Sequence, residues 1–354
     1  MAEIKKTPVN KWFKALMELD GAVDKTLDPY REENIIRTKS PSLNWIFANP
    51  GQGAPRNSSM VFYGKNKSGK SLISSLFVQE TLERDPEAIC ISFNTESRGA
   101  LQTGSLFGID PNRYITYDGN NPVDIFDRVE KEIFPMIDEG MPLKILIIDS
   151  IQGIRGIKSL NADSVGDHLI GDEALTIKNG FKRIAAGLKS RNVHFCCTSH
   201  MSANIGAMGH APKDKPALSW FAKHLFEYFI EVSRNGGAEG KVDILGNKFE
   251  GDTKDAKDKK EVTGHRIFVK MAENSLGTSG RSGELTIDYK KGLINIEDEI
   301  VELAINTKTV ERPNNRTYIV DGQEFSSKEK FVLGVRDSKE LQDILLKKIA
   351  TKDS

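Results

Sequence analysis

Residues 60–71 read MVFYGKNKSGKS, and their order indicates what kind of sheet this 354-residue chain forms. The apolar run at the start suits a buried strand, and the segment SLISSLFVQETL (71–82) suits a helix directly after it. Residues 64–71 match the pattern GxxxxGK followed by Ser or Thr at every fixed position. Glycines let backbone N–H groups converge on phosphate oxygens at the positive end of the helix. We therefore expect a phosphate-binding loop whose ligand residues are Gly64, Lys65, Asn66, Lys67, Ser68, Gly69, Lys70, Ser71 and Leu72.

This loop predicts that the chain binds ATP together with Mg2+. Lys70 is expected to reach the β- and γ-phosphates, and the Ser71 hydroxyl to ligate magnesium. The segment KILIIDS (144–150) ends a buried strand in an acid, so Asp149 should lie beside the loop and hold magnesium through water. An Asp at the end of a strand is also a common cap of a following helix, but the expected phosphate-binding loop earlier in the chain favours the metal role for Asp149. The alternative for Lys65 and Lys67 is that they are solvent-exposed charged side chains and do not contact the ligand.

Two further side chains are expected at the same edge of the sheet. Glu96 closes the strand AICISFNTE (88–96), where a carboxylate can polarise the water that attacks the γ-phosphate. His200 follows the strand VHFCCTS (193–199), where it can sense the γ-phosphate by hydrogen bond and pass the signal to the loop behind it. A surface glutamate in a turn and a structural histidine are the alternatives. The predicted catalytic residues are thus Glu96, Lys70 and His200.

The apolar pattern predicts an α/β fold with a mainly parallel central sheet covered on both faces. Strands alternate with amphipathic helices from residue 60 to 199, with helices expected at 69–84, near 100–107, at 124–139 and at 172–190. The strands at 228–233, 265–271 and 284–290 have no long helices between them, which indicates antiparallel additions at one edge.

Three regions are expected along the chain. An N-terminal helix and linker occupy 1–35, and the helix (9–20) either packs on its own core or contacts a neighbouring subunit. The sheet core occupies 36–295 and carries a mixed-charge segment at 236–262, read as a solvated hairpin loop with a DNA-contacting tongue as the alternative. A small α+β domain at 296–354 holds helices at 297–306 and 338–350.

Composition narrows the possible partners and compartments. The 50 basic and 50 acidic residues cancel, so nucleic-acid binding would depend on local basic loops and not on a cationic surface. Apolar residues make up 38% of the chain, the ordinary balance of a folded globular protein. Cys90, Cys196 and Cys197 lie in strand-like runs without a CxxC pair and are expected as buried thiols. No signal peptide or membrane segment is recognisable, which predicts the cytoplasm and no membrane partner.

Several of these segments together resemble the RecA recombinase family. They are GKNKSGKS (64–71), NTE (94–96), LIIDS (146–150) and TSH (198–200). The segment IIRTKSPSLN (35–44) is similar to the UvsX-like recombinases of T-even bacteriophages, and NRTYIVDGQEF (315–325) with KELQDILLKKI (339–349) resembles the small C-terminal domain of bacterial RecA. The resemblance implies a RecA-like core and a DNA-dependent ATPase that forms filaments on single-stranded DNA. It also implies pairing with homologous duplex DNA in recombination, repair and replication, together with mediator or single-strand-binding proteins.

The resemblance also assigns DNA-contacting and cross-subunit residues. Two loops of the family bind DNA, and the matching segments here are 153–168, with Arg155 and Lys158, and 201–218, with Asn204, Lys213 and Lys215. Cations that reach the neighbouring subunit's ATP are missing at Asn274 and Leu276, so Lys270 or Arg281 is expected to replace them. The family's adenine-stacking aromatic is Thr103 here.

Two other functions stay open at this stage. The chain could be a ring-forming DNA motor such as a helicase, although it shows no primase-binding or helical N-terminal domain. It could also be a weakly hydrolysing DNA-binding scaffold in recombination, which the missing cations favour.

Overall fold

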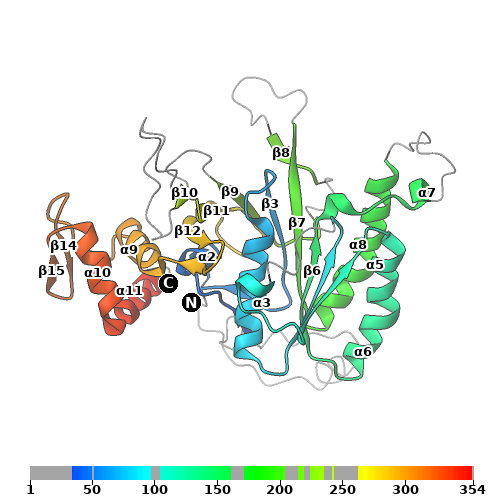
Figure 1. Cartoon of the computed structure of the whole chain (residues 1–354), viewed down its shortest axis with the longest axis horizontal. Coiled ribbons are helices and arrows are strands. Elements are labelled where there is room, and N and C mark those ends of the chain that lie inside the picture. The colour runs from blue at the N-terminus through cyan, green and yellow to red at the C-terminus, as the bar shows by residue number, and fades with distance from the viewer. Residues whose placement is uncertain are drawn as a thin grey trace, which may run out of the picture.

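The computed structural model describes residues 34–49, 52–96, 104–160, 171–203, 214–218, 224–234, 241–242 and 262–352. A large sheet with helices on both faces forms most of the molecule, and a smaller helical unit lies at one end (Figure 1). The expected helix at 9–20 and most of the segment 236–262 lie outside the described residues. The α/β class with a mainly parallel central sheet is confirmed.

Six strands run parallel in the order β9-β3-β7-β6-β4-β5. Their bounds are β3 (Ser59–Gly64), β4 (Ile89–Asn94), β5 (Tyr114–Asp118), β6 (Leu143–Asp149), β7 (His194–Ala203) and β9 (Tyr228–Arg234). The inner strands are almost continuously apolar because both of their faces are covered. Because all six strands point the same way, their carboxyl ends meet at one edge of the sheet.

Antiparallel strands complete the sheet beyond β9. β11 (Gly264–Asn274) pairs with both β9 and β12 (Ser282–Asp288), and β13 (Gly292–Ile294) pairs with β12. Two short strands join this sheet, β8 (Asp214–Pro216) on β7 and β10 (Lys241–Val242) on β11, and β1 (Ile35–Ile36) and β2 (Ala54–Pro55) form a separate pair. The antiparallel edge is thus as predicted, except that β9 joins β3 in parallel. The apolar pattern of a strand does not encode its direction.

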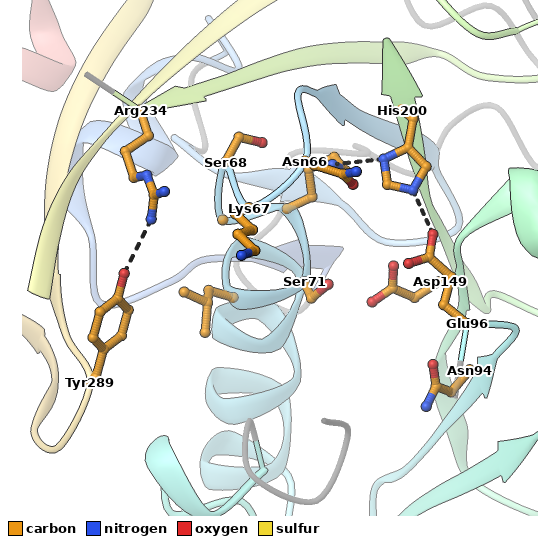
Figure 2. A pocket seen from close by; sticks show the side chains of 13 residues that line it. Asn66, Lys67, Ser68, Ser71, Asn94, Glu96, Asp149, His200, Arg234 and Tyr289 are labelled. Carbon is orange, nitrogen blue, oxygen red and sulfur yellow. Dashed lines mark hydrogen bonds and ion pairs between the residues drawn. The ribbon is translucent and has the colours of Figure 1, made fainter. Parts of the chain in front are cut away.

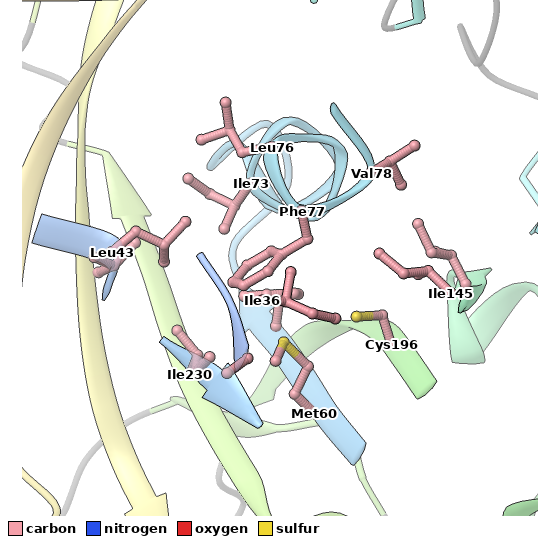
Figure 3. Close-up of a cluster of buried hydrophobic side chains, with 14 of the residues drawn as sticks. Ile36, Leu43, Met60, Ile73, Leu76, Phe77, Val78, Ile145, Cys196 and Ile230 are labelled. Atoms are coloured by element: carbon pink, nitrogen blue, oxygen red, sulfur yellow. The ribbon is translucent and has the colours of Figure 1, made fainter. Parts of the chain in front are cut away.

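Each face of the sheet has its own hydrophobic cluster. α3 (Lys70–Arg84) covers one face and points Phe77 down toward Met60 and Ile36 (Figure 3). A run of helices that includes Phe126, Phe134 and Phe181 covers the other face. These helices are α5 (Pro122–Arg128), the π-helical turn η2 (Val129–Ile133), α6 (Phe134–Asp138) and α8 (Asp172–Ser190). The expected helix at 124–139 is therefore present, and its π turn lies just before Pro135, whose ring does not fit a regular helix interior.

Short helical elements connect these layers. They are α2 (Pro41–Trp45), the 3-10 turn η3 (Ile151–Gly153) and α7 (Ile157–Leu160). All three cysteines are free and buried, as expected, and burial raises the pKa of the Cys90 thiol to about 12. Within the described residues, no helix combines the length and the apolar character that a membrane crossing requires.

The C-terminal elements share a third hydrophobic cluster, centred on Val301, Phe331 and Leu345. They are α9 (Ile296–Asn306), β14 (Tyr318–Val320), β15 (Gln323–Phe325), α10 (Lys328–Asp337) and α11 (Lys339–Thr351). The helix α10 was not predicted, because Gly334 interrupts its pattern. A side chain at Gly334 would collide with the Phe325 ring, so this glycine allows β15 to pack on the helix. The domain limits themselves stay a prediction.

Candidate active site

The loop at 64–71, which the sequence predicts to bind phosphate, has the tight backbone that its glycines predict. Gly69 has φ 103°, and a Cβ there would approach Ile267 Cδ1 to 2.5 Å. A Cβ at Gly64 would overlap the carbonyl oxygen of Val232 on β9. The Ser68 hydroxyl is buried without a hydrogen-bond partner among the described residues. Both glycines are therefore required, and the loop keeps a free donor for a phosphate.

The Lys70 ammonium is buried within the loop. It donates to the carbonyl oxygens of Gly64 (3.1 Å) and Lys65 (3.0 Å). Desolvation by burial lowers the pKa of Lys70, while the charges of Asp149 and Glu96 act in the opposite direction. A phosphate group would supply further negative charge to this ammonium.

Lys70, His200 and Glu96 form a hydrogen-bonded chain. Figure 2 shows the contact between His200 and Glu96. Lys70 Nζ lies 3.4 Å from His200 Nδ1, and His200 Nε2 lies 2.5 Å from Glu96 Oε1. An ammonium can only donate, so Nδ1 must accept and the imidazole proton must sit on Nε2, from where it donates to the carboxylate. The Ser150 hydroxyl donates to the same carboxylate oxygen at 2.6 Å. The Glu96 carboxylate is thus held in place from two sides.

Asp149 and Ser71 supply the oxygen atoms that magnesium prefers. Asp149 ends β6 and accepts a hydrogen bond from the Thr198 hydroxyl, and Figure 2 shows its carboxylate beside Glu96, on the side that faces Ser71. Within the described part of the chain, no three His, Cys, Asp or Glu side chains cluster as metal ligands. A magnesium site needs no such cluster, because it takes one or two protein oxygens and completes its shell with water and phosphate oxygens. The residues present fit this ion.

A pocket of about 350 Å³ joins these groups. Its lining comprises Asn66, Lys67, Ser68, Gly69, Lys70, Ser71, Leu72, Asn94, Glu96, Asp149, His200, Arg234 and Tyr289. All of the predicted catalytic, metal and loop residues are here except Gly64 and Lys65, which line a second hollow behind the loop. Parallel strands explain this gathering, since β3, β4, β6 and β7 all end at this edge.

Arg234 and Tyr289 were not predicted as part of the site. Arg234 Nη1 donates to the Tyr289 hydroxyl at 3.3 Å, and that hydroxyl also contacts His265 Nδ1. The residue Tyr289 is 44% exposed and lies at the left of the pocket in Figure 2, away from Glu96. An aromatic ring beside the phosphate loop can stack on a nucleobase. The signal in the sequence was weak, because the two residues lie 55 positions apart.

Of the residues expected to contact DNA or a neighbouring subunit, those that the structure describes do not line this pocket. Arg155, Lys158 and Lys215 are exposed, while Asn204 and Lys213 lie outside the described residues. Lys270 is exposed on β11. The Arg281 guanidinium lies 3.9 Å from the centre of the Trp45 ring, so this cation is held by its own chain. These roles stay predictions.

Comparison with known proteins supports the resemblance seen in the sequence. The chain is 22% identical over 263 residues to the protein RecA of Francisella philomiragia, a match that covers 73% of this chain and 64% of that one. It is 21% identical over 339 residues to the protein RecA of Helicobacter hepaticus, covering 95% and 90%. The recombination and repair protein of Enterobacteria phage T4 is 22% identical over 175 residues, covering 48% and 44%.

These matches confirm the resemblance to the RecA family and to a T-even phage recombination protein. The chain spans less than two thirds of the length of the Francisella and phage proteins, although it spans most of the Helicobacter one. No protein-family model matches the chain.

Proposed function

We propose that this chain is an ATP-dependent recombinase. It hydrolyses ATP in the pocket described above, assembles into filaments on single-stranded DNA, and promotes pairing and strand exchange with a homologous duplex. The observation that carries the proposal is the chain from Lys70 through His200 to Glu96 within a pocket that the loop 64–71 also lines. The similarity to RecA proteins and to a phage recombination and repair protein supports it. The proposed compartment is the cytoplasm, or the host cytoplasm if a phage encodes the chain.

Each part of the pocket has a defined task in this proposal. The loop N–H groups and Lys70 bind the phosphates, and Glu96 polarises the attacking water. Magnesium, when held by Ser71 and Asp149, neutralises charge on the phosphate oxygens. His200 keeps Glu96 oriented, because its Nε2–H donates to that carboxylate.

Substitution of Lys70 tests the assignment of the pocket. The variant Lys70→Ala should abolish ATP turnover with and without single-stranded DNA, since it removes the buried cation that meets the phosphates. Lys131→Ala is the matched control, because this lysine is exposed, pairs with Asp127 and does not line the pocket. Wild-type turnover by Lys70→Ala, measured as phosphate release, would refute the site.

The type of assembly is tested by microscopy. Electron microscopy with single-stranded DNA and a non-hydrolysable ATP analogue should show helical filaments. Closed rings would instead support the DNA motor, and filaments with negligible turnover would support the recombination scaffold. Asn274 favours the scaffold, because its side-chain amide donates to Thr278 O, accepts from Leu276 N and carries no positive charge.

A mixing experiment tests whether Lys270 acts on the neighbouring subunit's ATP. Lys270 is exposed, whereas Arg281 is held over Trp45, so we propose Lys270 for this role. Lys70→Ala and Lys270→Ala should each be inactive alone. Mixed in equal amounts, they should recover about a quarter of the wild-type turnover, because about one head-to-tail interface in four then joins an intact loop to an intact Lys270. No recovery on mixing would exclude the cross-subunit role.

A further inference from the structure

Gln152 hydrogen-bonds to β7 at Ser199 and His200, and His200 lines the pocket. β6 pairs with β7 only as far as Ile148 and Cys197. Beyond this point β7 continues to Ala203 and pairs with β8 from Met201 onward, and the Gln152 side chain, from η3, bonds to β7 between these two pairings. Its Oε1 accepts from His200 N at 2.9 Å, and its Nε2 donates to Ser199 Oγ at 2.9 Å.

A closed triangle of hydrogen bonds joins Gln152, His200 and Ala217. His200 N donates to Gln152 Oε1 (2.9 Å), Ala217 N donates to His200 O (2.8 Å), and Gln152 Nε2 donates to Ala217 O (2.7 Å). Both donors of the Gln152 amide are used, and so is its acceptor. No other standard side chain of this size offers one acceptor and two donors in this arrangement, which makes glutamine a specific choice at position 152.

The triangle touches three parts of the proposed machinery at once. The His200 side chain enters the nucleotide pocket, where it contacts Lys70 and Glu96. Gln152 immediately precedes the segment 153–168, and Ala217 lies within the segment 201–218. The exposed cations Arg155 and Lys215 lie within three residues of these two corners. A shift of the His200 backbone must therefore move both segments or break the triangle.

We propose that Gln152 is the positioning residue that couples the nucleotide pocket to both DNA-contacting segments. The proposal rests on the proposed function, since it assumes that these segments bind DNA. Charge in the pocket acts on the His200 side chain, and the triangle passes the displacement of its backbone to residues 153 and 217. A coupling of this kind is a ratio of DNA affinities with and without nucleotide, typically about 5- to 150-fold.

Two variants of Gln152 remove different sets of its hydrogen bonds. Gln152→Ala removes all three side-chain hydrogen bonds. Gln152→Glu keeps an acceptor for His200 N but cannot donate to Ala217 O or to Ser199 Oγ, so it breaks one side of the triangle. Gln79→Ala is the control, because Gln79 pairs with Glu83 on the exposed surface of α3.

The experiment measures single-stranded DNA binding by fluorescence anisotropy, with and without a non-hydrolysable ATP analogue. Calorimetry of analogue binding and a thermal unfolding curve accompany it. Both Gln152 variants should bind the analogue within about threefold of wild type, while the ratio of DNA affinities with and without the analogue falls from its wild-type value toward about 1. Gln79→Ala should keep the wild-type ratio.

Two results would overturn the inference. One is a wild-type affinity ratio in the folded Gln152→Glu variant. The other is an equal loss of DNA binding with and without the analogue, which indicates a structural role alone. If the wild-type protein itself binds DNA independently of nucleotide, the proposed function is refuted, and the inference falls with it.

Discussion

Glu299 is a buried carboxyl group where α9 meets the segment around α2, and its charge should govern the pH dependence of stability. Its Oε2 accepts from Ser40 Oγ at 2.5 Å and from Ser42 N at 3.0 Å. Burial raises its pKa to about 8 from the ordinary 4.5, although these hydrogen bonds act in the opposite direction. Between these two pH values the folded state holds the proton more tightly than the unfolded state. The stabilisation is therefore complete below pH 4.5 and is lost as the pH rises through 8.

The size of this loss follows from the shift of the pKa. Between pH 4.5 and 8, each pH unit lowers the free energy of unfolding by about 1.4 kcal/mol, which gives about 3 kcal/mol between pH 5 and pH 7.5. Glu299→Gln keeps an oxygen acceptor for Ser40 and Ser42 and cannot ionise. The free energy of unfolding of this variant, relative to wild type, should therefore rise by about 3 kcal/mol over this pH range.

Urea titrations at several pH values measure this difference. The fluorescence of Trp45 is a suitable probe, because this residue packs on the C-terminal hydrophobic cluster. Glu302→Gln is the matched control on the same helix, since its side chain is 44% exposed and pairs with Lys328. A wild-type curve that runs parallel to the Glu299→Gln curve at every pH would refute the reasoning.

Three further predictions concern the sheet and the pocket. Gly64→Ala should lower ATP affinity at least about tenfold and cost about 1–3 kcal/mol of stability, because the new Cβ overlaps the rigid Val232 carbonyl. A wild-type ATP affinity of this variant, measured by calorimetry, would contradict the prediction. His194 is fully buried and its pKa is lowered to about 3, so its stabilisation is present above pH 6.5 and is lost as the pH falls toward 3. Wild type should lose about 2 kcal/mol from this group between pH 7 and pH 5, and His194→Asn should lack this loss in urea titrations. Tyr289→Ala should raise the KM for ATP about tenfold and leave kcat within about threefold, and steady-state kinetics with the reverse pattern would exclude its stacking role.

The sequence was most informative where local pattern and strand order agree. The loop at 64–71, together with Glu96, Asp149 and His200, could be expected at one edge because each follows an apolar strand of a parallel sheet. The structure places them around one pocket, and their roles stay predictions. Gln152 could not be found in this way, because its contacts with positions 199, 200 and 217 depend on the point at which the pairing of β6 with β7 ends.

Local pattern also failed where a residue serves packing from a distant segment. Gly334 lowers the helix propensity of residues 328–337, so the pattern did not indicate α10. The reason for the glycine is the Phe325 ring, which lies too close for any side chain at position 334. A helix that forms around a glycine therefore depends on a tertiary contact that no local propensity contains.

The direction of β9, which the sequence did not indicate, explains why Arg234 and Tyr289 were missed as pocket residues. Because β9 runs parallel to β3, its register brings Tyr228–Glu231 beside Met60–Tyr63 and carries Val232 past Gly64. The same direction places Arg234 at the edge where the phosphate loop lies, and β11 and β12 then bring Tyr289 to it. An antiparallel β9 would put the start of the strand, not Arg234, at this edge. Gly64 is therefore required because Val232 of β9 lies against it, and the same strand carries Arg234 to the pocket. The glycine of the loop motif and the two missed residues thus depend on one long-range contact, the parallel pairing of β9 with β3.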